Sequence, residues 1–196
     1  MTLIDPVSAV VPAGMMSRHE QPVIQLAGGV ELRPWQQTDA SALVASSLDP
    51  AIRQWNRVRP LSPEEARQKI ARWHERWRTE SAAVWAICRT ADEEILGLIG
   101  LGDIDLHGGS AEYLYWVLPA ARGTGVATHA TVALSRWAFD DLGLHRLQLT
   151  HSTANEASCR VATKAGFELE GTMRSALLHA DGWHDEHLHA RVRGDE

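Results

Sequence analysis

The sequence has few cysteines, no excess of positive charge and no long apolar run. Its 196 residues include only Cys88 and Cys159 as cysteines, too few for a disulfide framework, so we expect a reducing, cytoplasmic location. The formal net charge of −6 lacks the basic footprint that binding to a phosphate backbone needs, which argues against nucleic acid and suits a cationic partner. No segment resembles a membrane span or the core of a signal peptide, so no membrane partner is expected.

The length fits one domain with a sizeable core of its own. Residues 1–21 carry Asp5 early, two prolines and only short apolar runs. We therefore expect a flexible tail over residues 1–24 and a single folded domain over residues 25–196.

Helix signals are clear in the first half of the chain. After a predicted strand at 30–33, Thr38 is expected to cap a helix. The run Ser62-Pro63-Glu64-Glu65 provides an N-cap, a proline at N1 and a glutamate at N3, which predicts a helix that extends to about Arg78. Its apolar residues recur every three or four positions and should form one packed stripe: Ala66, Ile70, Trp73 and Trp77.

The second half alternates strands and helices. Three strands, at 83–88, 95–104 and around Glu112, should form an antiparallel meander. A helix over 125–142 should end at Gly143, and a strand at 147–149, a helix from Asn155 and a strand at 167–169 form a crossover unit. The pattern predicts an α/β (α+β) fold on a mostly antiparallel sheet.

The most informative segment is 111–128, in which an aromatic strand enters the turn Arg122-Gly123-Thr124-Gly125 at the start of a helix. Such a turn directs several backbone N–H groups to one point and can hold a pyrophosphate. It lacks the third glycine of a dinucleotide-binding fingerprint and the Gly-Lys-Ser/Thr of a P-loop, which argues against NAD and ATP. A tight turn without a ligand is the alternative for this segment alone.

Two further blocks narrow the interpretation. The Arg122-x-x-Gly125-x-Ala127 turn is followed by an N-x-x-S block at 155–158 and a G-F-x-x-E-G block at 166–171. Together they resemble the GNAT superfamily of acyl-CoA N-acyltransferases, in particular the Rim-type branch of ribosomal-protein N-terminal acetyltransferases. The resemblance covers roughly residues 30–192 and includes a closing hairpin near 181–185. It implies a twisted sheet of about seven strands, splayed at the acyl-CoA site, with about four helices on its faces.

The resemblance also implies acetyl-CoA as co-substrate and no metal. The pantetheine arm would pair with the splayed strand and the pyrophosphate with the turn. The cofactor-binding residues implied are Trp116, Val117, Leu118, Arg122, Gly123, Thr124, Gly125, Val126, Ala127, Thr128, Asn155 and Ser158.

Catalytic candidates follow from the same comparison. Many relatives protonate the leaving thiolate with a tyrosine at a position that is Ala162 here, so Ser158 is the first candidate for general acid and Asn155 for a positioning group. Helix capping is the alternative for both residues. Glu112 is the candidate base, acting through a water chain, with His151 as a second option.

Three C-terminal histidines, His184, His187 and His189, suggest a metal site at first. His187 and His189 should share a strand face, but the sequence offers no third ligand at a known spacing, so no metal is predicted. Asp185 is expected to satisfy backbone donors near the turn at Asp181-Gly182.

The expected function is transfer of acetyl from acetyl-CoA to a primary amine, with a protein or peptide N-terminus as the first candidate acceptor. Aminoglycosides and polyamines are alternative acceptors, and a non-catalytic acyl-CoA sensor is the alternative outside enzymes. The Rim-type acidic residue expected shortly after residue 171 is missing from 173–177. Trp55, Trp73 and Trp77 are candidates for an acceptor groove, and a homodimer is an open alternative.

Overall fold

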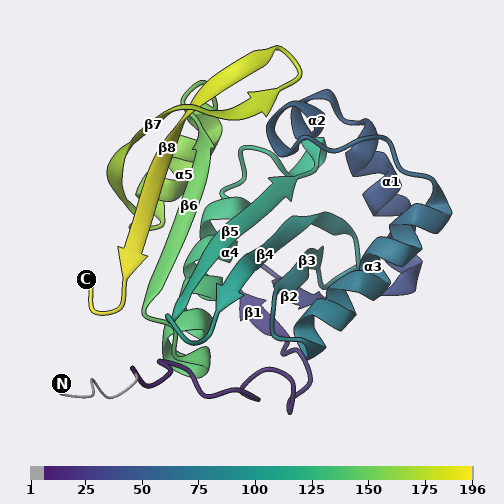
Figure 1. Cartoon of the computed structure of the whole chain (residues 1–196). Coiled ribbons are helices and arrows are strands. Elements are labelled where there is room, and N and C mark those ends of the chain that lie inside the picture. The colour runs from purple at the N-terminus through teal and green to yellow at the C-terminus, as the bar shows by residue number, and fades with distance from the viewer. Residues whose placement is uncertain (1–6, 196) are drawn as a thin grey trace, which may run out of the picture.

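A computed structural model describes residues 7–195, and in these residues eight strands form one sheet with helices on both faces (Figure 1). The strands are β1 (Ile24–Leu26), β2 (Val30–Pro34), β3 (Ala83–Arg89), β4 (Ile95–Asp105), β5 (Ser110–Val117), β6 (Arg146–Ser152), β7 (Glu168–His179) and β8 (Gly182–Val192). The α-helices are α1 (Ala40–Leu48), α2 (Pro50–Asn56), α3 (Pro63–Arg78), α4 (Val126–Arg136) and α5 (Glu156–Lys164). Short 3-10 turns lie at η1 (Gln37–Asp39) and η2 (Pro119–Ala121), and α4 continues into the π-helical η3 (Trp137–Leu142).

The order of strands across the sheet is β1-β2-β3-β4-β5-β6-β8-β7, and only β5 and β6 pair in parallel. Their pairing is limited to three positions and ends at Glu112 opposite Gln148, although β5 continues to Val117 and β6 to Ser152. Beyond Glu112 the two strands therefore separate. This confirms the predicted mostly antiparallel, splayed sheet, with one more strand and one more helix than expected.

Local sequence signals explain where the helices begin and end. Ser62 and Glu65 form the predicted capping box at the start of α3, and Gly143 ends η3 with a φ of 91°. The predicted cap at Thr38 is wrong. Instead, the Asp39 carboxylate accepts the N–H of Gln36 at 2.7 Å, and α1 begins immediately afterwards.

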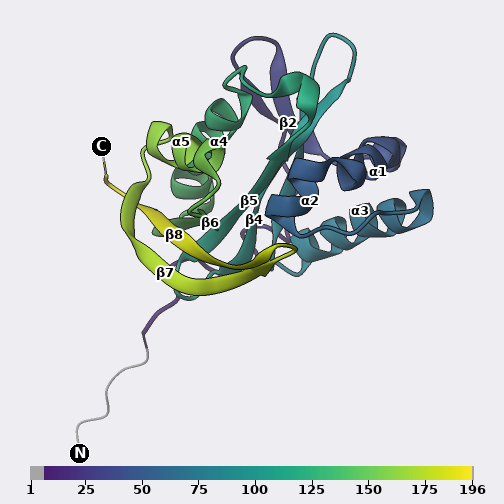
Figure 2. The same cartoon turned by 90° about the horizontal axis from the view of Figure 1, so that it is seen from above.

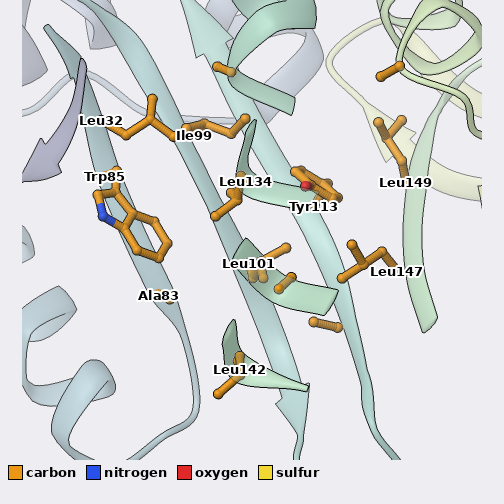
Figure 3. Packing of buried hydrophobic residues seen from close by; sticks show 14 of the residues in the cluster. Leu32, Ala83, Trp85, Ile99, Leu101, Tyr113, Leu134, Leu142, Leu147 and Leu149 are labelled. Atoms are coloured by element: carbon orange, nitrogen blue, oxygen red, sulfur yellow. The ribbon is translucent and has the colours of Figure 1, made fainter. Parts of the chain in front are cut away.

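Two apolar cores lie on opposite faces of the sheet. Viewed from above, α1, α2 and α3 lie on one side and α4 and α5 on the other (Figure 2). The core beneath α4 contains Trp85, Leu134 and Leu147, which are fully buried (Figure 3). Trp73 and Trp77 belong to the cores, so the stripe of α3 is packed as predicted and these two residues do not line an acceptor groove.

Part of the expected flexible tail packs onto the domain. Val11 and Met16 are buried, and the N–H of Val11 donates to the carbonyl of Leu106 at 2.9 Å. The Glu80 carboxylate also accepts backbone N–H groups of this segment, including that of Met16 at 2.7 Å. The folded unit thus begins before residue 25, while residues 1–6 of the predicted tail lie outside the described part. Within the described part, no helix combines the length and apolar character needed to cross a membrane.

Candidate active site

A cavity of about 570 Å³ opens where β5 and β6 have separated. Its wall combines the end of β5, the turn before α4, the start of α5 and the exposed side of α2, which lies close to the end of β5 (Figure 1). The lining residues are Ala51, Ile52, Trp55, Asn56, Tyr115, Trp116, Val117, Ala121, Arg122, Gly123, Gly125, Val126, Ala127, Thr128, Asn155, Ala157, Ser158, Arg160, Val161 and Lys164. Ten of the twelve predicted cofactor-binding residues are in this set; the exceptions are Leu118 and Thr124.

The glycine turn presents free backbone to the cavity. Gly123 and Gly125 have φ values of 78° and 84°, which other residues adopt only with strain. A Cβ on Gly123 would meet no atom within 4 Å, and one on Gly125 would meet only the His129 side chain at 3.7 Å. The first turn of α4 has no side-chain cap, so its N–H groups and the positive end of the helix dipole are available to an anion.

The Arg122 side chain supports this turn from the outside. Its guanidinium donates to the Val117 carbonyl at 3.2 Å and to the Asp49 carboxylate at 2.6 Å. Asp49 is also the N-cap of α2, so the pair connects the end of β5 with the helix that covers the cavity. The Thr124 hydroxyl donates to the Ala121 carbonyl at 2.8 Å, which gives it a role within the turn.

Three residues at the end of β5 were predicted to contact the pantetheine arm, but not all of them have free backbone groups. The N–H of Leu118 donates to the Leu96 carbonyl at 2.8 Å, and the Leu118 side chain packs on the core. The structure therefore does not support the predicted contact at Leu118. Successive residues of a strand direct their backbone groups to opposite edges, so those of Val117 face the gap. Trp116 lines the cavity while most of its ring is buried.

A pair of hydroxyl groups lies on the wall of the cavity. Tyr115 comes from the separated part of β5, and its hydroxyl lies 2.5 Å from the hydroxyl of Ser158 on α5. Burial raises the pKa of Tyr115 to about 12, so the phenol keeps its proton at neutral pH. From the sequence we expected no tyrosine in this role, because the position that many relatives use is Ala162 here. The structure instead brings a tyrosine to α5 from the strand: Tyr115 contacts Ser158, and strand alternation could have indicated which face of β5 it occupies.

For Asn155 the sequence left open a helix cap and a position at the active site, and the structure shows that it caps α5 and lies at the cavity. Its side-chain oxygen accepts the N–H of Ser158 at 3.2 Å, which makes it the N-cap of α5. It also lines the cavity. The cap thus fixes the turn that carries Ser158.

Glu112 is the last residue of β5 that pairs with β6, and it faces away from α4 and α5. Its carboxylate accepts a hydrogen bond from the Thr150 hydroxyl at 2.5 Å. Glu186 on β8 is also close, and burial raises its pKa, an effect that His179 opposes and the charge of Glu112 increases. Neither carboxylate lines the cavity: Glu112 lies at the vertex of the splay, and Glu186 lies opposite Ser152 at the end of β6.

Trp55 connects the cavity with this polar region. Its ring lines the cavity and lies 6.0 Å from the ring of His179 and 6.2 Å from that of His184, centroid to centroid. His184 in turn hydrogen-bonds the Ser152 hydroxyl through Nδ1 at 2.7 Å. Of the three tryptophans considered for an acceptor groove, Trp55 alone lies at the cavity.

Two other candidates have structural positions. His151 is buried on the α5 face and does not line the cavity, which does not support it as a base. Asp185 accepts the N–H of Ser175 at 2.8 Å, at an irregularity in the β7–β8 pairing. Its predicted use as a backbone acceptor is confirmed.

Comparisons with known proteins agree with this geometry. The family model described as "Acetyltransferase (GNAT) domain" matches residues 30–168. The probable N-acetyltransferase YjcK of Bacillus subtilis (strain 168) is 26% identical over 174 residues, which cover 85% of this chain and 96% of the relative. The ribosomal-protein-serine acetyltransferase of Escherichia coli (strain K12) is 30% identical over 101 residues, covering 52% of this chain and 56% of that protein.

Solved structures share the fold. The ribosomal L7/L12 alpha-N-protein acetyltransferase RimL, in complex with coenzyme A, superposes with a TM-score of 0.80 at 23% identity and covers 89% of this chain and 100% of RimL. GNAT acetyltransferases use acetyl-CoA, and the glycine turn, uncapped helix and separated strands described above fit that co-substrate. The chain belongs to the GNAT acetyltransferase family and is an acetyl-CoA-dependent N-acetyltransferase.

Proposed function

We propose that this enzyme acetylates the N-terminal amine of a protein or peptide by direct transfer from acetyl-CoA in a ternary complex. The observation that carries the chemistry is the hydroxyl pair of Tyr115 and Ser158 on the cavity wall, 2.5 Å apart. The acceptor class is supported by the similarity to the ribosomal-protein-serine acetyltransferase and by the two carboxylates, Glu112 and Glu186, at the splay.

The donor would bind through the glycine turn. The N–H groups from Gly123 to Thr128 take the pyrophosphate, with the helix dipole of α4 adding positive potential. Trp116 and Val117 line the path of the pantetheine arm, and the backbone N–H of Val117 offers it a hydrogen bond.

The co-substrate supplies a thioester, whose carbonyl carbon the neutral amine attacks. A C–N bond forms and the C–S bond breaks, so the amine nitrogen must lose a proton and the leaving sulfur must gain one. Tyr115 and Ser158 together own two hydroxyl hydrogens and use one in their mutual hydrogen bond, which leaves the other for the thiolate. Because the pKa of Tyr115 is about 12, this pair acts as an acid and not as a base.

Glu112 takes the proton of the amine through water. Its position at the last β5–β6 pair places it at the vertex of the gap, on the face opposite Tyr115. Glu186 adds a second carboxylate, so an incoming ammonium group meets negative charge before it is deprotonated. A free N-terminus, with an unperturbed pKa near 8, loses its proton more easily than a lysine side chain.

The test is an acceptor panel with tag-free protein. Acetyl-CoA is incubated with N-terminal peptides, the same peptides with blocked N-termini, polyamines and aminoglycosides, and both free thiol and acetylated product are measured. Turnover on free but not blocked peptides is expected. Turnover on polyamines or aminoglycosides alone would replace the peptide acceptor, and tight coenzyme A binding without turnover on any amine would favour a sensor.

A further inference from the structure

Beneath α5, on the side away from Glu112, four side chains that can bind a metal converge. His151 comes from β6, Cys159 from α5, and His187 and His189 from β8. One ligand atom from each lies within 4.8 Å of the other three. His151 and Cys159 lie in a different part of the sequence from His187 and His189, which is why the sequence alone suggested only the C-terminal histidines His184, His187 and His189.

Strand register explains the convergence. His151 is paired with His187 across β6 and β8, and His189 lies two residues further on the same face. The rings of His151 and His189 are stacked with centroids 5.2 Å apart, and the ring of His187 is nearly perpendicular to that of His151 at 5.3 Å. Cys159 closes the group from α5.

Each of the three imidazoles has a buried ring nitrogen that no residue in 7–195 satisfies. Nε2 of His151, Nε2 of His189 and Nδ1 of His187 are buried and have no hydrogen-bond partner among the described residues. His151 is 6% exposed and His189 2%. Buried polar atoms are rarely left without partners, so three in one cluster indicate a missing ligand.

Hydrogen bonds fix the tautomer of two of these rings. Nδ1 of His151 bonds the Ser152 carbonyl at 2.8 Å, and Nδ1 of His189 bonds the Phe167 carbonyl at 3.4 Å. A carbonyl only accepts, so each Nδ1 carries the hydrogen and each Nε2 presents a lone pair. This arrangement, in which the non-ligating nitrogen donates to a backbone carbonyl, is the usual support of a metal-bound histidine.

We propose that His151, Cys159, His187 and His189 bind one Zn²⁺ ion. Three imidazoles and a thiolate form a nitrogen and sulfur donor set that suits tetrahedral zinc. In a tetrahedral zinc site the bond lengths place neighbouring ligand atoms about 3.3–3.6 Å apart. Side-chain rotations that move the ligand atoms by about 1 Å would therefore bring them to zinc-binding distance.

Four protein ligands leave no open position, which makes the site structural and not catalytic. The ion would join β6 and β8 to α5 one residue after Ser158. It therefore holds the first turn of α5, and with it the general acid, against the sheet. The inference rests on the cluster alone and is independent of the acceptor.

The experiment uses the full chain without a histidine tag. Metal content is measured by mass spectrometry, the metal is removed with a chelator, and the apo protein is titrated with Zn²⁺ and with Co²⁺. We expect one zinc per chain, a higher melting temperature with zinc, and the charge-transfer band of a cobalt–thiolate bond. Absence of both the cobalt band and the zinc-induced shift in the unaltered protein would overturn the proposal, whatever the variants do.

Matched variants locate the site. Cys159→Ser should remove the cobalt–thiolate band and weaken zinc binding by more than about 100-fold, because even the loss of an outer-shell partner costs 10–100-fold. Cys88→Ser removes the other cysteine and His107→Gln an exposed histidine, and both should leave the band unchanged. A band that persists in Cys159→Ser would refute this ligand set.

Discussion

Replacing Tyr115 by phenylalanine tests the catalytic pair with a control on the same strand. Tyr113 and Tyr115 lie two residues apart on β5 and face the same side. Each hydroxyl contacts a serine: Tyr113 lies 2.9 Å from Ser135 and Tyr115 lies 2.5 Å from Ser158. Only the second pair lines the cavity.

The two substitutions should separate stability from catalysis. Tyr113→Phe leaves the buried Ser135 hydroxyl without this partner and should cost about 1–3 kcal/mol of unfolding free energy, with kcat almost unchanged. Tyr115→Phe removes the proton donor and should lower kcat by about 10²–10⁴-fold, which corresponds to about 2.7–5.5 kcal/mol of transition-state stabilisation. Thiol release at saturating substrates gives kcat, and thermal or urea unfolding gives stability.

A double-mutant cycle adds a sharper criterion. If Tyr115 and Ser158 act as one donor, Ser158→Ala should be slow as well, and the double variant should be no slower than the slower single variant. Because the pKa of Tyr115 is about 12, kcat of the unaltered enzyme should also show no loss near pH 10 from this group. Equal kcat values for Tyr113→Phe and Tyr115→Phe would refute the assignment.

Three further predictions concern the glycine turn, a buried ion pair and a buried carboxylate. Gly123→Ala and Gly28→Ala, both at φ 78° with no atom within 4 Å of the new Cβ, should each cost about 1–2 kcal/mol of stability, but calorimetry should show weaker coenzyme A binding only for Gly123→Ala. Asp39→Asn breaks a buried pair in which both Arg33 terminal nitrogens bond the carboxylate at 2.8 and 2.9 Å, and urea unfolding should show a loss of about 3–5 kcal/mol; a loss below about 1 kcal/mol would contradict this. Burial raises the pKa of Glu186, so its contribution to stability is present at low pH and lost as pH rises through the folded pKa. Glu186→Gln should therefore increase stability at about pH 7.5 relative to the unaltered chain, and a gain of equal size at about pH 4 would exclude this origin.

The features that the sequence predicted well depend on short-range signals. The box of Ser62 and Glu65, the helix end at Gly143 and the turn around Gly123 each occupy a few adjacent residues whose backbone preferences act locally. The parallel pairing of β5 with β6 was not predicted, but it is the arrangement that a long helical connection between two strands allows.

The features that it missed depend on contacts between distant segments. Tyr115 and Ser158 are 43 positions apart, and their contact requires both the strand register and the placement of α5. Asp39, and not Thr38, precedes α1 because its carboxylate accepts hydrogen bonds from both the N–H of Gln36 and the buried Arg33. Glu80 similarly holds the N-terminal segment, although nothing near residue 16 in the sequence indicates a partner.

The position of Glu112 relative to Tyr115 gives the proposed reaction a direction. Residues three apart on a strand lie on opposite faces, so the base faces the α1–α3 side of the sheet and the acid faces α5. The gap between β5 and β6 connects these faces, whereas the neighbouring pairs β4–β5 and β6–β8 are closed by hydrogen bonds. In the proposed mechanism the amine therefore approaches from the side of Glu112 and Trp55 and loses its proton there, while the sulfur receives its proton on the other side. The early end of β5–β6 pairing thus leaves the acid and the base on separate sides of one opening, where they cannot neutralise each other directly.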